Sequence, residues 1–334
     1  MRTGKVSDSV LKRSVLRQIH TKRQEVLNGA GVGEDCAIFA SADAFFTCVS
    51  EAAVAGKADM ARVLVKCANN LATAGARPIA ALITLILPQD AQEQLLKELM
   101  AAAEETCGGM QMQIAGGHTT VSPHVDCPIA CVTACGIPGE ETVPGKPFTG
   151  LTTRGARPGQ AIVLTKWIAL EGTALLAREN RERLLQRYPV HLVEEAAGFD
   201  RYLSVVPEAA VAAKSGVRVM HDASEGGILA ALWELAESSG VGLTIDMRKI
   251  PIRQETVEVC ELCEVNPYAL ASGGCLILAA DHGEALAEQL VREGIPAAVI
   301  GQFTDSHDRL IYNADEKRYL DKPAQDEIFR YRNV

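Results

Sequence analysis

The sequence His221-Asp222-Ala223-Ser224-Glu225-Gly226-Gly227 opens a predicted helix that runs to about Ser239 and is expected to end at Gly240. Asp222 is a good N-cap residue, and Glu225 completes a capping box by bonding back to the amide of Asp222. The two glycines are poor helix formers, at a cost of about 1 kcal/mol each relative to alanine. They either expose N–H groups to a phosphate or allow close packing, and these residues alone leave both alternatives open.

Length and composition indicate a two-domain globular chain. The 334 residues exceed what one hydrophobic core usually supports, and 48% of them are hydrophobic. No apolar run reaches the ~18 residues that a membrane helix needs, and the polar N-terminus lacks the apolar core of a secretory signal. The net charge of −9 argues against non-specific nucleic-acid binding. We therefore expect a cytoplasmic protein with neither a membrane nor a nucleic-acid partner.

The ten cysteines are expected to be reduced thiols in such a compartment. Cys127, Cys131 and Cys135 share one parity in a strand-like run, so all three should face the same side. Cys260 and Cys263 form a CxxC within a helical pattern, and no second pair has matching spacing. A metal or iron–sulfur site is one interpretation of these residues, and small buried hydrophobes are the other, which we favour.

Hydrophobic periodicity predicts two sets of alternating elements. After a charged helical lead-in over 1–28, the expected helices are 57–74, 90–107, 228–239, 254–264 and 283–293. The expected strands are 45–49, 79–87, 110–114, 129–134, 161–165, 217–220, 243–245, 275–279 and 297–300. The proline- and glycine-rich run 138–159 is the best boundary. We expect one α/β or α+β domain over 1–150 and a second over 151–334.

Several polar residues stand where ligands often bind. Asp35 lies in a glycine-bracketed turn and Glu51 at the end of an expected strand, where carboxylates can hold Mg²⁺ together with substrate phosphates. His118 follows two glycines after another expected strand, and Asn70 lies in a helix. Taken singly, the carboxylates are better explained as solvated turn residues, His118 as a structural histidine and Asn70 as a polar helix contact.

Five motifs in order nevertheless form a specific pattern, which resembles the aminoimidazole ribonucleotide (AIR) synthase superfamily and within it the "AIR synthase related", HypE-like branch. The motifs are GxGxD at 31–35, NxLATAGARP at 69–78, GGHT at 116–119, LTKxxxxEGTA at 164–174 and MHDxxEGG at 220–227. The resemblance implies a PurM-like fold. Its N-terminal α/β domain pairs its sheet with a partner's in a homodimer, and its C-terminal α+β domain has a mixed sheet flanked by helices.

The resemblance also implies ATP and Mg²⁺, with Mn²⁺ as an alternative ion, and phosphoryl transfer that activates an amide or carbonyl oxygen of a small or protein-borne substrate. Asp35 and Glu51 are then the metal ligands, and His118 and Asp222 the catalytic candidates. The residues expected to contact the nucleotide are Gly31, Gly33, Asn70, Gly116, Gly117, Thr119, Gly226 and Gly227.

Departures from the hydrogenase maturase of this branch leave two hypotheses. The chain ends in Asn333 and Val334, without the maturase's terminal cysteine, so nitrile formation on its own tail is not expected. Thr120 and Gly273 stand where the maturase has lysine and glutamate, and Asn70 where aspartate is common. The chain is therefore either an ATP-dependent enzyme, which we favour, or a nucleotide-binding or scaffold homologue that has lost catalysis.

Overall fold

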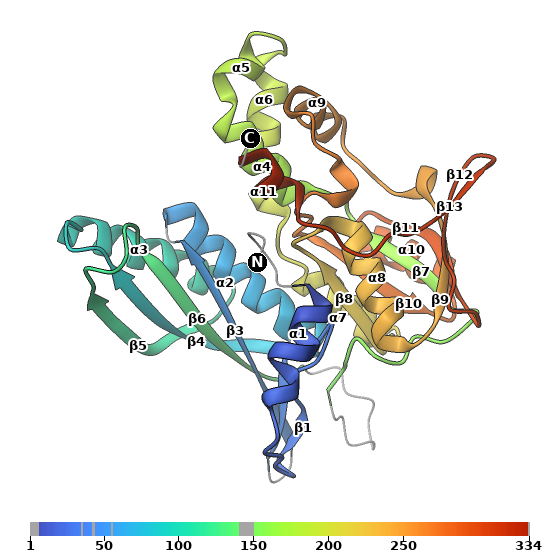
Figure 1. Ribbon diagram of the computed structural model, residues 1–334, viewed down its shortest axis with the longest axis horizontal. Coiled ribbons are helices and arrows are strands. Elements are labelled where there is room, and N and C mark those ends of the chain that lie inside the picture. Colours follow the sequence, from blue (N-terminus) through green and yellow to red (C-terminus); the bar gives the residue numbers. More distant parts are fainter. Residues whose placement is uncertain (1–6, 35, 42–43, 55, 140–149, 333–334) are drawn as a thin grey trace. The chain divides into compact units, whose positions relative to one another are not determined.

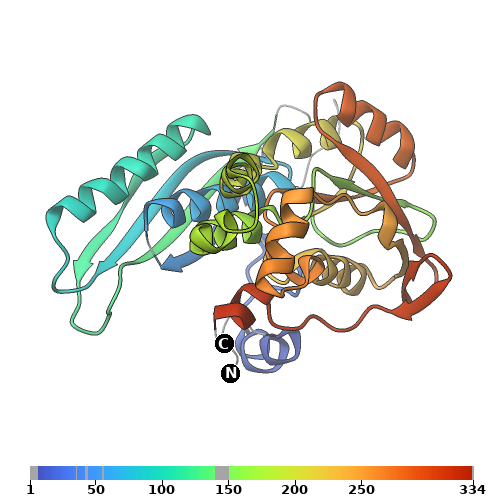
Figure 2. The ribbon, with the colours of Figure 1, turned by 90° about the horizontal axis from the view of Figure 1, so that it is seen from above.

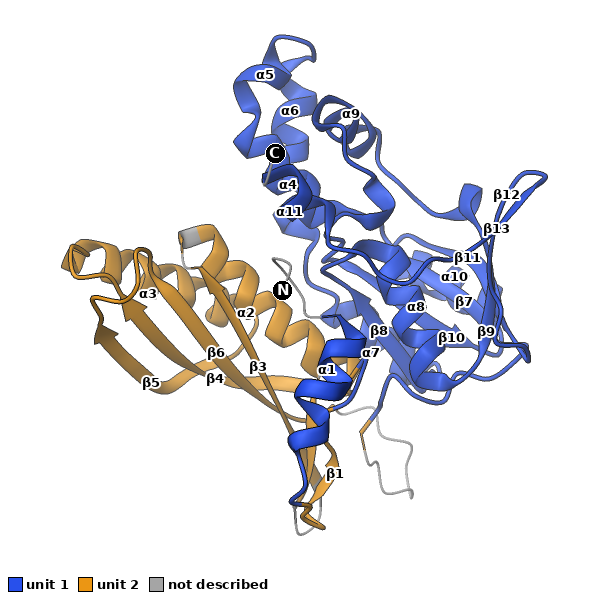
Figure 3. Ribbon diagram, in the orientation of Figure 1, with its two compact units in different colours: residues 1–21, 31–33, 151–334 blue, residues 22–30, 34–150 orange. Residues whose placement is uncertain are grey.

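The structure is a computed structural model that describes residues 7–34, 36–41, 44–54, 56–139 and 150–332. It divides into two compact units, coloured in Figure 3: an N-terminal unit of residues 22–30 and 34–150, and a C-terminal unit of residues 1–21, 31–33 and 151–334. The expected boundary at residue 150 coincides with this division. Residues 1–21 and 31–33, however, group with the C-terminal unit. No helix in the described ranges is long and apolar enough to cross a membrane.

The N-terminal unit is built on a six-stranded sheet in the order β1-β2-β3-β6-β4-β5. Neighbouring strands are antiparallel except β4 and β5, which are parallel and joined through helix α3, as the β-α-β pattern predicts. The GGHT motif lies inside β5 instead of closing it. The elements are β1 (Val26–Asn28), β2 (Ala37–Ser41), β3 (Ala44–Val54), α2 (Lys57–Thr73), β4 (Ala76–Leu87), α3 (Glu93–Gly109), β5 (Gln113–Val121) and β6 (Ile129–Pro138).

Helices α2 and α3 cover one face of this sheet (Figures 1 and 2). Strand β3 alternates accordingly: Phe45 and Val49 are buried toward the helices, whereas Phe46 and Val54 are exposed on the other face. Cys131 and Cys135 share that second face within β6, but Cys127 lies before the strand, so the three thiols do not form one row. The unit thus presents an apolar sheet face that none of its described helices covers.

The C-terminal unit contains a seven-stranded mixed sheet in the order β13-β12-β9-β11-β7-β10-β8. Helix α8 (Gly227–Ser239) packs on one face, where its Leu232 joins the core around Ile162 and Leu164, and α7 (Val206–Lys214) and α10 (Gly283–Arg292) contact the sheet as well. Buried side chains on both faces explain the nearly continuous apolar strands. The strands are β7 (Ala161–Thr165), β8 (Val219–Ala223), β9 (Gly242–Asp246), β10 (Cys275–Ala280), β11 (Ala297–Thr304), β12 (Arg309–Asn313) and β13 (Glu316–Tyr319).

A second core joins the remaining helices of this unit. It contains α4 (Leu170–Glu179), α5 (Arg181–Leu185), α6 (Val190–Ala197), α9 (Gln254–Cys263) and the C-terminal α11 (Glu327–Arg332). Cys260 and Cys263 are buried in it, and burial raises the pKa of Cys260 to about 12. The CxxC therefore fills the core of a helical cluster, in agreement with the interpretation of these thiols as buried hydrophobes.

The predicted capping box at the start of α8 is wrong. Strand β8 continues to Ala223 and pairs Asp222 with Leu276, so Asp222 is a buried strand residue four positions before the helix cap. The cap is Gly226, with φ 88°, and Gly240 ends the helix in the left-handed region as predicted. A Cβ on Gly227 would lie 2.6 Å from the carbonyl oxygen of Tyr268. Close packing therefore accounts for this glycine.

We predict that Gly227→Ala destabilises the C-terminal unit more than Gly240→Ala does. Both residues have positive φ, but a Cβ on Gly240 meets nothing within 4 Å. The Gly240 variant should lose about 1 kcal/mol of unfolding free energy, and the Gly227 variant about 1–3 kcal/mol more because the backbone must shift. Urea unfolding followed by tryptophan fluorescence reports on this unit, since Trp167 and Trp233 both belong to it. Equal losses would contradict the packing explanation.

Candidate functional site

Two of the sequence motifs meet at one edge of the C-terminal sheet. Strand β10 is antiparallel to both β7 and β8, so the loops after β7 and β8 lie beside the loop before β10. Main-chain bonds join them: Ser272 N–H donates to Ser224 O (3.1 Å), and Gly172 N–H donates to Ala271 O (2.9 Å). Ser272 Oγ also accepts a bond from Ala169 N–H at 2.9 Å. The loops of LTKxxxxEGTA and MHDxxEGG are thereby held together through residues 271 and 272.

The carboxylate of Asp326 closes this edge. Its Oδ2 accepts from Gly226 N–H at 2.6 Å, and its Oδ1 from Ile328 N–H at 2.9 Å and Ala271 N–H at 3.3 Å. Burial raises the pKa of Asp326 from 3.8 to about 6, which the three N–H donors partly oppose. The amide of Gly226, predicted to meet a phosphate, is therefore engaged by the chain's own carboxylate.

Buried charged pairs support the same edge. Lys166 of the TK motif forms an ion pair with Glu208 of α7 and donates to Ser204 O at 2.6 Å; both charged residues are almost completely buried. His221 Nε2 lies 3.0 Å from Glu234 Oε2 on α8, also in the interior. Asp222, a catalytic candidate, is buried next to His221 in β8, and its negative charge helps to raise the pKa of the Cys275 thiol.

Glu171 fills the space beside Gly273. A Cβ on Gly273 would lie 2.5 Å from Oε2 of Glu171, so the glycine leaves room for that carboxylate. Glu171 lies in the first turn of α4 and is only partly buried. The space beside Gly273, where no carboxylate was expected, therefore contains the carboxylate of Glu171 from the first turn of α4. Sequence spacing gave no signal for this contact, because about a hundred residues separate the two positions.

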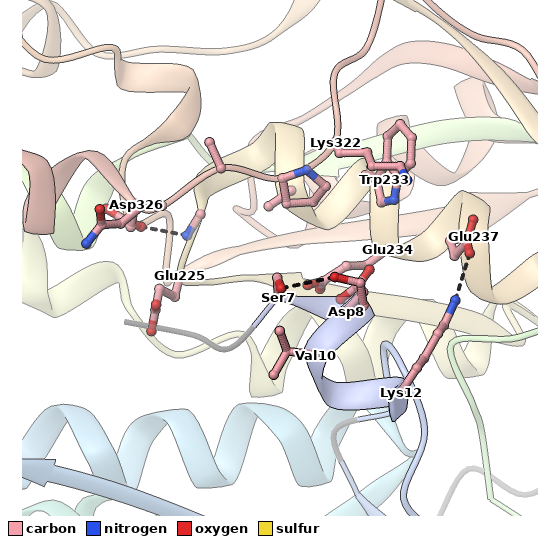
Figure 4. A pocket seen from close by; sticks show the side chains of 16 residues that line it. Ser7, Asp8, Val10, Lys12, Glu225, Trp233, Glu234, Glu237, Lys322 and Asp326 are labelled. Atoms are coloured by element: carbon pink, nitrogen blue, oxygen red, sulfur yellow. Dashed lines mark hydrogen bonds and ion pairs between the residues drawn. The ribbon is translucent and has the colours of Figure 1, made fainter. Parts of the chain in front are cut away.

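A pocket of about 530 Å³ adjoins the start of α8. Figure 4 shows its lining: Ser7, Asp8 and Lys12 come from α1 (Asp8–Ser14) and the residue before it, and Trp233, Glu234 and Glu237 come from α8. Asp326 and Glu225 border its other end. Five carboxylates and two lysines line the pocket. This balance disfavours a polyanionic ligand such as a nucleotide triphosphate.

The N-terminal unit brings two predicted site residues together. Asn70 Nδ2 donates to Glu51 Oε1 at 3.1 Å, and Lys66 Nζ lies 3.0 Å from Glu51 Oε2. Cys36 Sγ donates to Asn70 O at 3.0 Å, which holds the residue after the GxGxD motif against the same helix. Asp35, the other predicted metal ligand, lies outside the described residues. Sequence reasoning missed Lys66, although it precedes Asn70 by four positions on α2 and so shares its face.

The GGHT motif lies elsewhere in this unit. Strands β6 and β4 separate β5 from β3, so His118 and Glu51 are on strands roughly 14 Å apart. His118 and Thr119 are exposed, and the register places His118 opposite Thr84. A Cβ on Gly117 would lie 1.9 Å from Ile83 O, so strand packing requires that glycine. Gly116, with φ 159°, is extended and exposed.

The first two predicted glycines belong to the C-terminal unit. Gly31 and Gly33 lie in its short segment 31–33, where Thr153 Oγ1 donates to Gly33 O at 2.6 Å. A Cβ on Gly33 would approach Glu234 O and Ser238 Cβ of α8, both at 3.6 Å. The positive φ of 72° at Gly33 is the feature that favours glycine there.

Of the two residues expected to hold Mg²⁺, only Glu51 is described, and its described neighbours do not complete a metal site. No group of three or more histidine, cysteine or acidic side chains there is arranged to hold an ion. Both carboxylate oxygens of Glu51 already have protein partners, the Asn70 amide at Oε1 and the Lys66 ammonium at Oε2. Mg²⁺ requires about six oxygen ligands in near-octahedral geometry. We therefore derive no chemical step through a protein-bound ion.

Two family models match the chain. The N-terminal domain of AIR synthase related proteins matches residues 26–138, and the C-terminal domain of AIR synthase related proteins matches residues 157–313. The chain belongs to the AIR synthase related family. This result agrees with the order of its five motifs.

Relatives of this AIR synthase related chain include two carbamoyl dehydratases named HypE. The protein of Rhodobacter capsulatus is 28% identical over 247 residues, which cover 72% of this chain and 68% of that protein. The protein of Azotobacter vinelandii is 29% identical over 266 residues, with coverage of 75% and 69%. The crystal structure of the hydrogenase maturation protein HypE in complex with ATP matches with TM-score 0.68 at 19% identity, covering 98% of this chain and 97% of that one. The PurM-like two-domain fold is thus confirmed.

We predict that Asp326 makes the stability of the C-terminal unit depend on pH. Because its pKa is raised, the folded chain keeps a proton that the unfolded chain has released between about pH 4 and 6. Its contribution is complete below pH 3.8 and is lost as the pH rises through about 6. Relative to Asp326→Asn, the wild type should lose up to about 3 kcal/mol across this range. Urea unfolding of both proteins at pH 5 and 7.5 measures the change, and a constant difference would contradict it.

Proposed function

We propose that the chain is an ATP-dependent enzyme that activates an amide or carbonyl oxygen of a separate substrate. Support comes from relatives named carbamoyl dehydratase, which match both halves of the chain, and from a related structure that contains ATP. In this chemistry ATP supplies the phosphoryl group that allows the substrate oxygen to leave as phosphate. The chain's own contribution is to position the substrate and to accept its proton.

Helix α11 is packed into the C-terminal unit. Asp326 and Tyr331 fasten it, since Tyr331 Oη donates to Asn180 Oδ1 at 2.6 Å, and Ile328 is buried in the helical core. Arg330 donates to Glu264 O at 2.8 Å. Residues 326–332 are therefore held in the fold, which supports the proposal that the reacting amide belongs to another molecule.

Glu171 is the observation that favours an enzyme over an impaired homologue. The family resemblance places a glutamate at position 273, and in this chain a carboxylate from position 171 occupies the adjoining space. It is partly exposed at the edge where the motif loops meet, so it can reach a substrate. We assign Glu171 the role of accepting a proton from the substrate nitrogen. The alternative remains a nucleotide-binding scaffold.

We predict that Glu171→Gln lowers ATP turnover by about 10²-fold or more, the usual effect of removing a general base, without changing ATP affinity. Glu179→Gln is the matched control, since Glu179 lies at the far end of the same helix and pairs with Arg332. Calorimetry with ATP in Mg²⁺, Mn²⁺ or EDTA gives the affinity. ADP release with a panel of primary amides, including carbamoylated peptides, gives the turnover.

Each result of that experiment distinguishes the hypotheses. Absence of ATP binding in every buffer would remove the nucleotide-dependent proposal. Binding without turnover on any amide would favour the scaffold alternative. Equal turnover in the wild type and in Glu171→Gln would show that this carboxylate is not the base.

We further propose that the chain forms a homodimer through the uncovered face of the N-terminal sheet. Large apolar side chains gather there on two strands, and such patches commonly mark interfaces. They are Phe46 and Val54 of β3 and Leu82 of β4, with exposed fractions of 39%, 60% and 42%.

We predict that Leu82→Lys produces a folded monomer, because a charge on this face would have to be buried at the interface. Val190→Lys is the control: Val190 is 61% exposed but lies at the start of α6, in the other unit. Light scattering gives the mass, and circular dichroism checks the fold. A wild-type mass of one chain, or a dimer that survives Leu82→Lys, would contradict the proposed interface.

A further inference from the structure

The cluster around Glu51 contains a fixed positive charge where the resemblance places a metal ion. Lys66 and Glu51 form a close ion pair across the α2–β3 contact, with side-chain exposures of 36% and 23%. Asn70, itself buried, donates a hydrogen bond to the second oxygen of this carboxylate. Glu51 is therefore neutralised within the protein, and its two oxygens point at an ammonium and an amide.

A divalent ion and Lys66 cannot use this carboxylate together. An ion at about 2.1 Å from Oε2 would lie close to the ammonium, which is 3.0 Å from the same oxygen, and the two cations would repel each other. Metal binding would first require Lys66 to leave. Asn70 adds to the effect because its amide is neutral and presents its nitrogen, a donor, to Glu51.

We propose that Lys66 takes the place of a divalent ion in this cluster, so that the chain contacts nucleotide phosphates through a built-in ammonium and depends less on metal. An ammonium is a compact point charge that binds phosphate well, as in other nucleotide sites. Lys66 is partly exposed, so it can contact a phosphate while its stem stays on α2. The Cys36–Asn70 bond holds Cys36, the residue after the GxGxD motif, at this helix.

The first test uses Mn²⁺ alone and is independent of the proposed function. Lys66→Met keeps the length of the side chain and its helix propensity but removes the charge. We expect the variant to gain at least about tenfold in Mn²⁺ affinity, as measured by electron paramagnetic resonance, because Glu51 is released. Adding Glu51→Gln to Lys66→Met should abolish the gain. If Lys66→Met shows no gain in Mn²⁺ affinity, the proposal is overturned. It is also overturned if the wild type binds Mn²⁺ and the single substitution Glu51→Gln removes that binding.

The second test uses ATP and rests on the proposed function. In EDTA, the wild type should keep its ATP affinity within about threefold of the value in Mg²⁺, whereas Lys66→Met should lose about tenfold, the effect of one charge-assisted contact. Mg²⁺ should restore binding to the variant. Lys97→Met is the control, since Lys97 is exposed on α3 in the same unit and pairs only locally with Glu93.

The outcomes separate the two proposals. ATP binding that EDTA abolishes in the wild type, with no change in Lys66→Met, overturns the role of Lys66 and leaves the proposed function standing. No ATP binding to any variant, together with the expected gain in Mn²⁺ affinity, overturns the proposed function and supports Lys66 as the occupant of the metal position. Melting temperatures check the fold, and a partly exposed pair should change them little.

Discussion

Three main-chain N–H groups from three separate segments donate to one carboxylate, that of Asp326. Buried backbone donors need acceptors, and leaving one unsatisfied costs about 1–3 kcal/mol. The bond to Gly226 sets the start of α8, and the bond to Ala271 connects that turn to the loop before β10. The bond to Ile328 caps α11. The shape of the loop edge and the position of α11 therefore follow from the same interaction.

The sequence predicts the elements of this protein better than their boundaries. Helix α8 and its end at Gly240 follow from an apolar stripe and a glycine, both of which are local signals. Its start does not, because the acceptor is a hundred residues away and Asp222 is paired within a strand. Local capping rules name a plausible partner for a helix end. They cannot show that a distant carboxylate has replaced it.

The residues of the candidate site were likewise predictable only in part from the sequence. The contact between Glu51 and Asn70 agrees with the family pattern, which marks both positions. The resemblance groups His118 with them, but two strands, β6 and β4, separate its strand from β3. The glycines at 117 and 227 were assigned to ligand binding, yet neighbouring backbone leaves no room for a Cβ at either one. A glycine in a motif indicates close approach by some group, and sequence alone does not say whether that group is a ligand or the protein.

At the position where an anionic phosphate is expected and at the position where a metal cation is expected, the protein places a side chain with the same sign of charge as the ligand. Asp326 stands where a phosphate was predicted, and Lys66 stands where a cation was predicted. A ligand that competes with such an occupant binds with an apparent affinity equal to its intrinsic affinity multiplied by the fraction of time the position is empty. At Asp326 the occupant holds three bonds and supports the fold, so displacement would unfasten α11. At Glu51 the ammonium is partly exposed. The phosphate contact proposed for Lys66 would therefore leave the fold intact, whereas displacement of Asp326 would not.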